Sequence, residues 1–206
     1  MECDYGDDTW SGDASIVGYS VTDIQSSDGD LASFTVALNA DPGTTEVVGY
    51  PDDQCLIYAA LPPSLTSSFD ITPPADSSGL DYEYAYDIWL TTASDAVNAN
   101  WNNDLELMIW TYVNGQVPAG SVAATLSDGA QVWVDGSNTT GTVSVVLPQN
   151  ETIGTVNITS IISQLTALGY VNTADNGILD VGYGIEAPYG GGRTFEVNGF
   201  SVTTGS

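Results

Sequence analysis

The sequence predicts an all-β domain built as a sandwich of two sheets. Short runs of Val, Ile, Tyr and Thr recur along the chain, and turn-forming segments separate them, in keeping with 22 glycines and 9 prolines in 206 residues. Hydrophobic residues make up 42% of the chain, which is enough for a buried core and argues against disorder. Neither an internal repeat nor a low-complexity linker divides the sequence, so we expect residues 1–206 to form a single domain.

The apolar runs and the turn sequences between them place the strands. We expect strands at 13–22, 32–39, 45–50, 54–60, 64–72, 80–91, 104–112, 121–126, 130–135, 141–147, 178–186 and 194–203. One segment has helical spacing instead, with apolar residues at Ile158, Ile161, Ile162, Leu165 and Leu168. Asn157 is placed to cap its start, and Gly169 follows its last apolar residue. This pattern predicts one short amphipathic helix packed on the sandwich.

The charge balance excludes several classes of function. Against 27 acidic residues stands one cation, Arg193, and the chain has no Lys and no His. A surface without cations cannot neutralise phosphates, so we expect neither nucleic acid nor an anionic membrane as partner. The lack of His excludes Ser-His-Asp and Cys-His catalysis and His-ligated zinc. Any chemistry must therefore use carboxylates, hydroxyls or a calcium ion.

Several features fit an exported protein. The acidic residues are spread along the whole chain, as expected for a solvated secreted surface, for adaptation to high salt or for an acid environment. Cys3 and Cys55 could pair as a disulfide, and sequons begin at Asn138, Asn150 and Asn157. No apolar run is long enough to span a membrane, and no signal segment is recognisable, so we expect Met1 to begin a processed mature chain. The prediction is a secreted, extracellular monomer.

The segment 104–110 carries a carboxylate among aromatic and sulfur-containing side chains. Alternate residues of a strand point to opposite faces, so Leu105, Leu107 and Ile109 share one apolar face. Glu106, Met108 and Trp110 share the other. This combination fits a cleft in which sugar rings stack, whereas the simpler interpretation is a half-buried edge strand with a stray acid.

The segment 82–90 repeats this arrangement. Its tyrosines share one face with Ile88 and Leu90, and the other face carries Glu83, Ala85, Asp87 and Trp89. A carboxylate again stands two residues from a tryptophan. If the two strands are neighbours, Asp87 could hydrogen-bond Glu106 and tune its ionisation.

A third segment, 182–192, brings a second glutamate of interest. Glu186 shares its strand face with Gly182 and Gly184, which we expect to leave open space for a bound polysaccharide. A turn rich in Pro, Tyr and Gly follows, and its Tyr189 is a candidate for sugar contact; the alternative is a strand that runs into a flexible loop. Together the three segments supply two glutamates and an assisting aspartate, the minimum set for glycoside hydrolysis.

These residues resemble glycoside hydrolase family 12, a family of β-jelly-roll endoglucanases. The matching segments are Ala85-Tyr86-Asp87-Ile88-Trp89, Glu106-Leu107-Met108-Ile109-Trp110, Val117-Pro118-Ala119-Gly120-Ser121 and the glycine-rich stretch ending in Glu186. Tyr50-Pro51 and the helix ahead of the Glu186 strand fit the same order, and the resemblance covers 45–206. It implies an all-β fold, a two-sheet antiparallel β-jelly-roll sandwich with one short amphipathic helix.

The resemblance also implies roles for individual residues. Glu106 corresponds to the nucleophile, Glu186 to the general acid/base and Asp87 to the aspartate that hydrogen-bonds the nucleophile. It implies retaining, endo-acting cleavage of a β-1,4-glucan by double displacement, for which the two glutamate carboxyl groups should stand about 5–5.5 Å apart. Trp89, Met108, Trp110 and Tyr189 are the candidate substrate-binding residues. Neither a cofactor nor a metal is expected.

Two departures from the family pattern and three rival classes complete the prediction. The family's Asn-Asn-x-Trp-Gly stretch is missing, with Trp10 as its candidate replacement, and Ala187 separates Glu186 from Pro188, which bears on how the leaving-group sugar is positioned. A family 11-like xylanase would share the fold and the glutamate pair. A non-catalytic carbohydrate-binding sandwich would need neither glutamate, and a surface-layer protein would explain the acidity but not the cleft residues.

Overall fold

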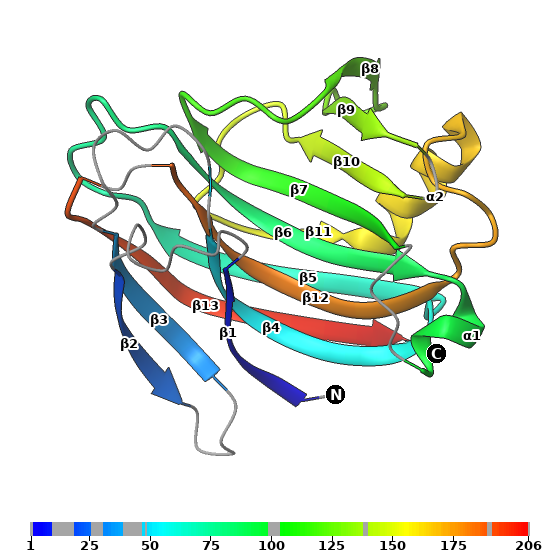
Figure 1. Ribbon diagram of the computed structural model, residues 1–206, viewed down its shortest axis with the longest axis horizontal. Helices are drawn as coiled ribbons and strands as arrows, with labels where there is room; N and C mark the ends of the chain where they lie inside the picture. Colours follow the sequence, from blue (N-terminus) through cyan, green and yellow to red (C-terminus); the bar gives the residue numbers. More distant parts are fainter. Residues whose placement is uncertain are drawn as a thin grey trace.

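The computed structural model describes residues 2–9, 19–25, 31–38, 47, 49–98, 104–137, 140–188 and 191–205, and statements about absent features refer to these residues. Its strands form two sheets that stack face to face (Figure 1). The elements are β1 (Glu2–Thr9), β2 (Tyr19–Gln25), β3 (Leu31–Leu38), β4 (Gly49–Ala60), β5 (Ser64–Thr72), β6 (Tyr82–Thr91), α1 (Ala93–Ala96), β7 (Leu105–Asn114), β8 (Ser121–Thr125), β9 (Gln131–Gly136), β10 (Gly141–Val146), β11 (Ile153–Asn157), α2 (Ile158–Leu168), β12 (Gly177–Glu186) and β13 (Arg193–Gly205).

The two sheets differ in size. The larger has the strand order β1-β4-β12-β6-β7-β10-β9-β8, and the smaller has the order β11-β5-β13-β3-β2. Neighbouring strands run antiparallel except β7 and β10, which pair in parallel with Val143 opposite Leu107. The β8–β9 hairpin lies at the outer edge of the larger sheet, so β10 returns beside β7 in the direction of β7. The predicted two-sheet sandwich is therefore confirmed, with one parallel pair that the prediction did not contain.

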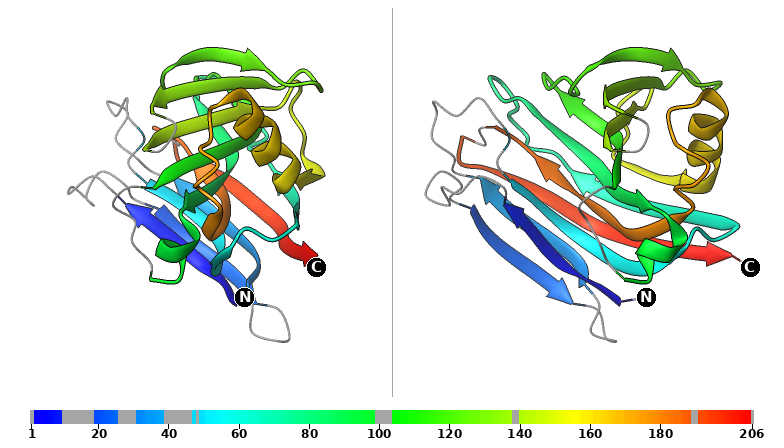
Figure 2. Two further views of the ribbon diagram at one scale, coloured as in Figure 1. Left: turned by 90° about the vertical axis from the view of Figure 1, so that its right-hand side faces the viewer. Right: turned by 45° about the vertical axis from the view of Figure 1, so that its right-hand side comes forward.

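The core lies between the sheets and follows from the alternation of side chains along each strand. On β5, buried residues alternate with more exposed ones from Leu65 to Ile71. Aromatic rings fill the centre: the ring of Tyr183 lies 4.6 Å from that of Tyr86 and 5.2 Å from that of Phe69. Figure 2 shows these layers from two further directions. The opposite face of the larger sheet, turned away from the core, is called the site face below.

The predicted helix is confirmed as α2. The Asn157 side chain accepts a hydrogen bond from the backbone N–H of Ser160 at 2.9 Å, and Gly169 ends the helix with a positive φ of 82°. The predicted stripe is buried against the core except at Leu168, which is 49% exposed. A second helix of one turn, α1, was not expected; the side chain of Thr92 caps it.

The strand boundaries required some corrections. The strands expected at 45–50 and 54–60 form one strand, β4, which continues through Pro51. Pro51 is paired with Asp7 of β1 on one side, while on the other side the pairing of β4 with β12 ends at the next residue, Asp52, so the proline is accommodated where only one neighbouring strand remains. Strands β1 and β11 were not in the predicted set, and of the strand expected at 13–22 only 19–22 is described.

The predicted disulfide is confirmed, and it joins Cys3 of β1 directly to its cross-strand partner Cys55 of β4. Within the described part of the chain, no helix is long and apolar enough to cross a membrane.

Candidate active site

The structure places the three predicted catalytic residues on three adjacent strands, β12, β6 and β7. Glu186 on β12 lies opposite Glu83 on β6, and Glu106 on β7 lies opposite Trp89 on β6. Asp87 lies between them along β6, directly opposite Met108 of β7. All three acids belong to the site face, because the residues that alternate with them are buried in the core.

Glu106 has a specific hydrogen-bond partner that the sequence did not indicate. The hydroxyl of Thr142 on β10, the residue opposite Glu106, donates a 2.5 Å hydrogen bond to Oε2 of the carboxylate. Burial raises the pKa of Glu106, and this hydrogen bond opposes the rise. Thr142 therefore favours the ionised carboxylate that a nucleophile requires.

Asp87 is surrounded by other carboxylates. Burial raises its pKa well above the ordinary value, and the charges of Glu106, Asp180 and Glu186 raise it further. Its Oδ1 has no hydrogen-bond partner among the described residues. These observations fit a neutral Asp87 at the centre of the acidic group, while its hydrogen bond to Glu106 stays a prediction.

Glu186 has the environment of a proton donor. Burial raises its pKa to about 6, a hydrogen bond with Glu83 opposes this rise, and the charge of Glu106 adds to it. The two glutamates are thus close enough for the ionisation of one to influence the other. A carboxyl that keeps its proton in weak acid beside an ionised carboxylate is the combination required of an acid/base pair.

The prediction that Gly182 and Gly184 leave open space for a polysaccharide is wrong. A Cβ on Gly182 would lie 2.5 Å from Oδ2 of Asp52 and 3.4 Å from the Tyr50 ring. A Cβ on Gly184 would lie 2.2 Å from the backbone oxygen of Pro51. The glycines are needed because β4 side chains and backbone fill the adjacent space, and Tyr50 reaches over them to donate a 2.8 Å hydrogen bond to the carbonyl of Ala85.

The candidate sugar-binding residues differ in exposure. Met108 and Trp110 lie on the site face but are only 5% and 4% exposed, because they pack together with Ala85 into a small apolar cluster. Trp89 is partly exposed. Tyr189 and Trp10 lie outside the described residues.

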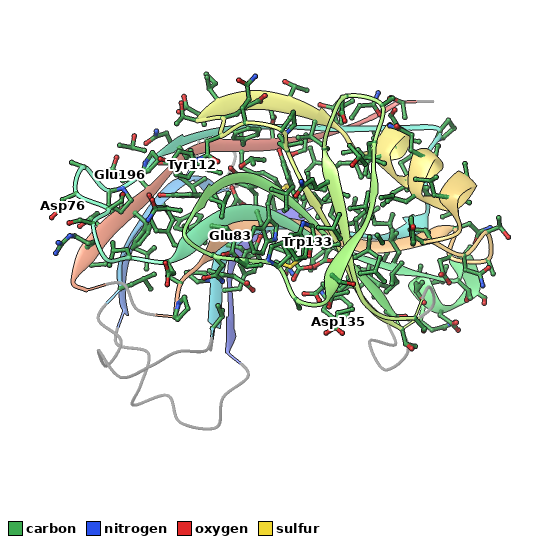
Figure 3. All side chains as sticks on the ribbon, turned by 90° about the horizontal axis from the view of Figure 1, so that it is seen from above. Asp76, Glu83, Tyr112, Trp133, Asp135 and Glu196 are labelled. Atoms are coloured by element: carbon green, nitrogen blue, oxygen red, sulfur yellow. A yellow bond between two sulfur atoms is a disulfide. The ribbon has the colours of Figure 1, made fainter. Side chains whose placement is uncertain are left out.

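Trp133 of β9 is a site-face aromatic that the sequence analysis missed. It lies opposite Ser144, which in turn lies opposite Met108, so the row crosses three strands. Trp133, labelled in Figure 3, is partly exposed, and its indole N–H has no hydrogen-bond partner in the described part of the chain. The alternation of Gln131, Trp133 and Asp135 in the predicted strand could have revealed it.

Another acid of the site face, Asp180, was also missed. Its carboxylate accepts hydrogen bonds from Nε2 of Gln54 and, at 3.3 Å, from the backbone N–H of Trp89. Asp180 continues the alternation of Glu186, Gly184 and Gly182 along β12, so the same pattern could have revealed it.

A groove of about 500 Å³ lies elsewhere, on the smaller sheet between β5, β11 and β13. Its lining includes one carboxylate, Asp70, together with Ser68, Thr155 and Ser201. It lacks the paired carboxylates that glycoside hydrolysis requires. The acidic group on the larger sheet is therefore the candidate active site.

Comparison with known proteins agrees with this geometry. The family model described as Glycosyl hydrolase family 12 matches residues 7–204, and the chain therefore belongs to glycosyl hydrolase family 12. It is a glycoside hydrolase of the cellulase type. No curated protein sequence matches the chain.

Solved structures share the fold at low sequence identity. Endoglucanase 3 of Trichoderma harzianum, from the same family, is 19% identical with a TM-score of 0.76, covering 93% of this chain and 86% of that one. The xyloglucanase domain of NopAA, a type three effector from Sinorhizobium fredii solved with cellobiose, is 23% identical with a TM-score of 0.72, covering 98% and 93%. A family 12 xyloglucanase from Bacillus licheniformis is 20% identical with a TM-score of 0.73, covering 96% and 90%. These similarities confirm the jelly-roll sandwich.

Proposed function

We propose that this chain is a retaining endo-β-1,4-glucanase that acts by double displacement, with Glu106 as nucleophile and Glu186 as general acid/base. The observation that supports this most directly is the contrast between the two carboxyls. Burial raises the pKa of both carboxyls, and a hydrogen bond opposes the rise at each, from Thr142 at Glu106 and from Glu83 at Glu186. At Glu186 the charge of Glu106 adds to the rise and the pKa is about 6, so Glu186 keeps its proton in weak acid.

In the first step Glu106 attacks the anomeric carbon while Glu186 gives its proton to the departing glycosidic oxygen. The bond from carbon to that oxygen breaks, and an ester between the sugar and Glu106 forms. Thr142 holds the attacking carboxylate through its hydroxyl.

In the second step the ionised Glu186 takes a proton from water. The oxygen of this water bonds to the anomeric carbon, the ester to Glu106 breaks, and Glu186 is protonated again. Two inversions at the same carbon give net retention of configuration, and both glutamates return to their starting protonation states.

The substrate we propose is a neutral β-1,4-glucan such as cellulose, mixed-linkage glucan or xyloglucan. The relatives named above as endoglucanase and xyloglucanase support this class. A net charge of −26 disfavours acidic polymers such as pectin, and partly exposed aromatics on the site face can stack on neutral sugar rings. We further propose that residues 1–206 act as one catalytic domain, as a monomer and after secretion.

The test measures reducing sugar released from a panel of β-glucans, xylan and pectin, and follows the anomer formed first by NMR. The proposal expects cleavage of a β-1,4-glucan with the β-anomer as first product. Preferential cleavage of xylan would favour a xylanase, and release from no polymer would favour a binding module. A first product with the α configuration would contradict double displacement.

Variants assign the two glutamates. Glu106→Gln should lower kcat by at least about 10³-fold on every substrate. Glu186→Ala should lower kcat strongly on glucan. With an aryl glycoside that has an activated leaving group, added azide should restore the turnover of this variant, and the product should be the β-glycosyl azide. Glu196→Gln, which changes a glutamate at the periphery of the molecule (Figure 3), is the matched control and should act like wild type. Full activity of Glu106→Gln would refute the assignment.

A further inference from the structure

A third glutamate, Glu83, lies inside the site and takes no part in the steps above. It stands on β6 directly opposite Glu186 of β12, and its side chain is 0% exposed. Figure 3 shows it in the interior of the molecule, whereas Asp76 and Glu196 lie at the periphery. A glutamate that is completely removed from solvent requires a physical explanation, because burying its charge is costly.

The groups around Glu83 offer no positive charge. Among the described residues, Glu186 is the charged group that acts on the ionisation of Glu83, and its charge is negative. The residue opposite Glu83 on β7 is the apolar Val113, and the nearby acids Asp87 and Glu106 interact with Glu186. The one cation of the chain, Arg193, pairs instead with Asp76 at 2.9 Å. Glu83 therefore cannot be buried as part of an ion pair and must be neutral to avoid the full desolvation cost.

The position of the proton follows from the hydrogen bonds. With both carboxyls ionised, neither oxygen of Glu83 has a hydrogen-bond donor among the described residues. Glu186 is the residue directly opposite Glu83, so a proton on one of the two carboxyls would let them hydrogen-bond to each other. Glu83 is completely buried, whereas Glu186 keeps contact with solvent, so the charged form costs more at Glu83. Burial accordingly raises the pKa of Glu83 well above the ordinary value. Glu186 is therefore the first of the two to release its proton.

We propose that Glu83 is a positioning residue for the acid/base: it remains protonated and donates a hydrogen bond to the carboxyl of Glu186. This inference rests on the role proposed for Glu186 and adds a mechanism by which that role is set. The hydrogen bond fixes the orientation of the Glu186 carboxyl. It also stabilises the ionised Glu186 that must accept a proton from water in the second step.

Two substitutions of similar size separate the hydrogen bond from the packing. Glu83→Gln keeps a donor and cannot ionise, and Glu83→Met keeps the chain length without a donor. Because the hydrogen bond lowers the pKa of Glu186, its loss in Glu83→Met should move the alkaline limb of kcat/KM upward by about one pH unit. Glu83→Gln should leave this limb close to that of wild type. A downward shift in Glu83→Gln would mean that Glu83 is ionised, and an unmoved limb in Glu83→Met would mean that it does not act on Glu186; either result overturns the proposal.

The leaving group gives a second readout that general damage to the fold would not produce. Glu83→Met should lower kcat on glucan about tenfold, since cleavage of this poor leaving group needs a well-placed proton donor. It should have little effect on an aryl glycoside whose leaving group departs without protonation. Equal losses on both substrates would indicate a structural defect and contradict the positioning role.

A spectroscopic test does not depend on hydrolysis. The infrared difference between wild type and Glu83→Gln at pH 7 should contain the carbonyl band of one protonated carboxylic acid, because only Glu83 differs. Absence of this band would overturn the proposal whatever the activity. A protein that shows the band but cleaves no β-glucan would contradict the proposed function and leave the Glu83–Glu186 hydrogen bond in place.

Discussion

Asp52 of β4 occupies the space beside Gly182 of β12 in which any other residue would carry a Cβ. That atom would lie 2.5 Å from Oδ2 of Asp52, well inside contact distance. The same carboxylate contributes to the raised pKa of Asp87, which lies opposite Gly182 on the other side. The glycine therefore lets a buried acid approach the site from the neighbouring strand.

We predict that Gly182→Ala disturbs both the site and the fold. The added methyl must displace Asp52, and overpacking of this kind costs about 1–3 kcal/mol of stability. Displacement of the Asp52 carboxylate should also lower kcat on β-glucan about tenfold, because the charge of Asp52 contributes to the pKa of Asp87. Gly199→Ala is the control, since nothing lies within 4 Å of its Cβ position. Equal effects of the two changes on activity would show that the Asp52 contact is unimportant.

Thr142 should set the acid limb of activity. Its hydrogen bond to Glu106 lowers the pKa of that carboxyl, so Thr142→Val should raise it, and the acid limb of kcat/KM should move upward by about one pH unit. Thr142→Ser retains the hydroxyl and should retain the limb. The pH profiles of the three proteins on one soluble β-glucan provide the measurement. A limb that moves equally in both variants would exclude the hydrogen bond as the cause.

Stability should decrease from mildly acid to neutral pH. Burial raises the pKa of Glu186 to about 6, so between the unfolded value of about 4.3 and that pKa the folded chain binds more protons than the unfolded chain. The stabilisation is complete below the unfolded value and is lost as the pH rises through 6. At pH 7 this one group costs about 2 kcal/mol.

Urea unfolding of wild type and Glu186→Gln at pH 4.5 and 7 measures this contribution. The variant cannot ionise at this position, so its stability should fall less between the two pH values, while Glu196→Gln should follow wild type. If Glu186→Gln retained the full pH dependence, the buried carboxyl would not be its source.

The sequence predicted best where a strand alternates without interruption. Segment 64–72 coincides with β5, and the two faces of β7 were assigned correctly from Leu105 to Trp110, because every second residue is apolar. The capped helix was equally clear. The strand through Pro51 was divided in two because proline usually ends a strand, and only the pairing with β12 shows why it does not do so here.

The site was less predictable because it depends on pairing between distant strands. Glu83 was placed on the correct face, but its contact with Glu186 follows from the register of β6 and β12, which no local pattern specifies. Thr142 meets Glu106 only because β10 pairs with β7 in parallel. The glycines of β12 were misinterpreted for the same reason, since the side chain that fills their space comes from β4.

The strong negative charge leads to a prediction about salt. One cation stands against 27 acidic residues, and the ion pair between Arg193 and Asp76 is exposed, so few attractive contacts exist for salt to weaken. Repulsion among the carboxylates dominates, and folding brings them closer together than they are in the unfolded chain. Because the screening length falls from about 10 Å at 0.1 M salt to about 3 Å at 1 M, salt should stabilise the folded state.

Melting temperature should therefore rise between about 0.05 and 2 M NaCl at neutral pH, and most of the rise should come below about 1 M, where the screening length changes most. At pH 4.5 the same titration should have a smaller effect, since many surface carboxyls are then close to their ordinary pKa of about 4 and carry less charge. Sodium sulfate at matched ionic strength serves as a control, because an additional rise in sulfate reports its exclusion from the protein surface rather than screening. A melting temperature at neutral pH that does not change with NaCl would show that repulsion among the carboxylates does not limit stability, and adaptation to high salt would no longer explain the acidic composition.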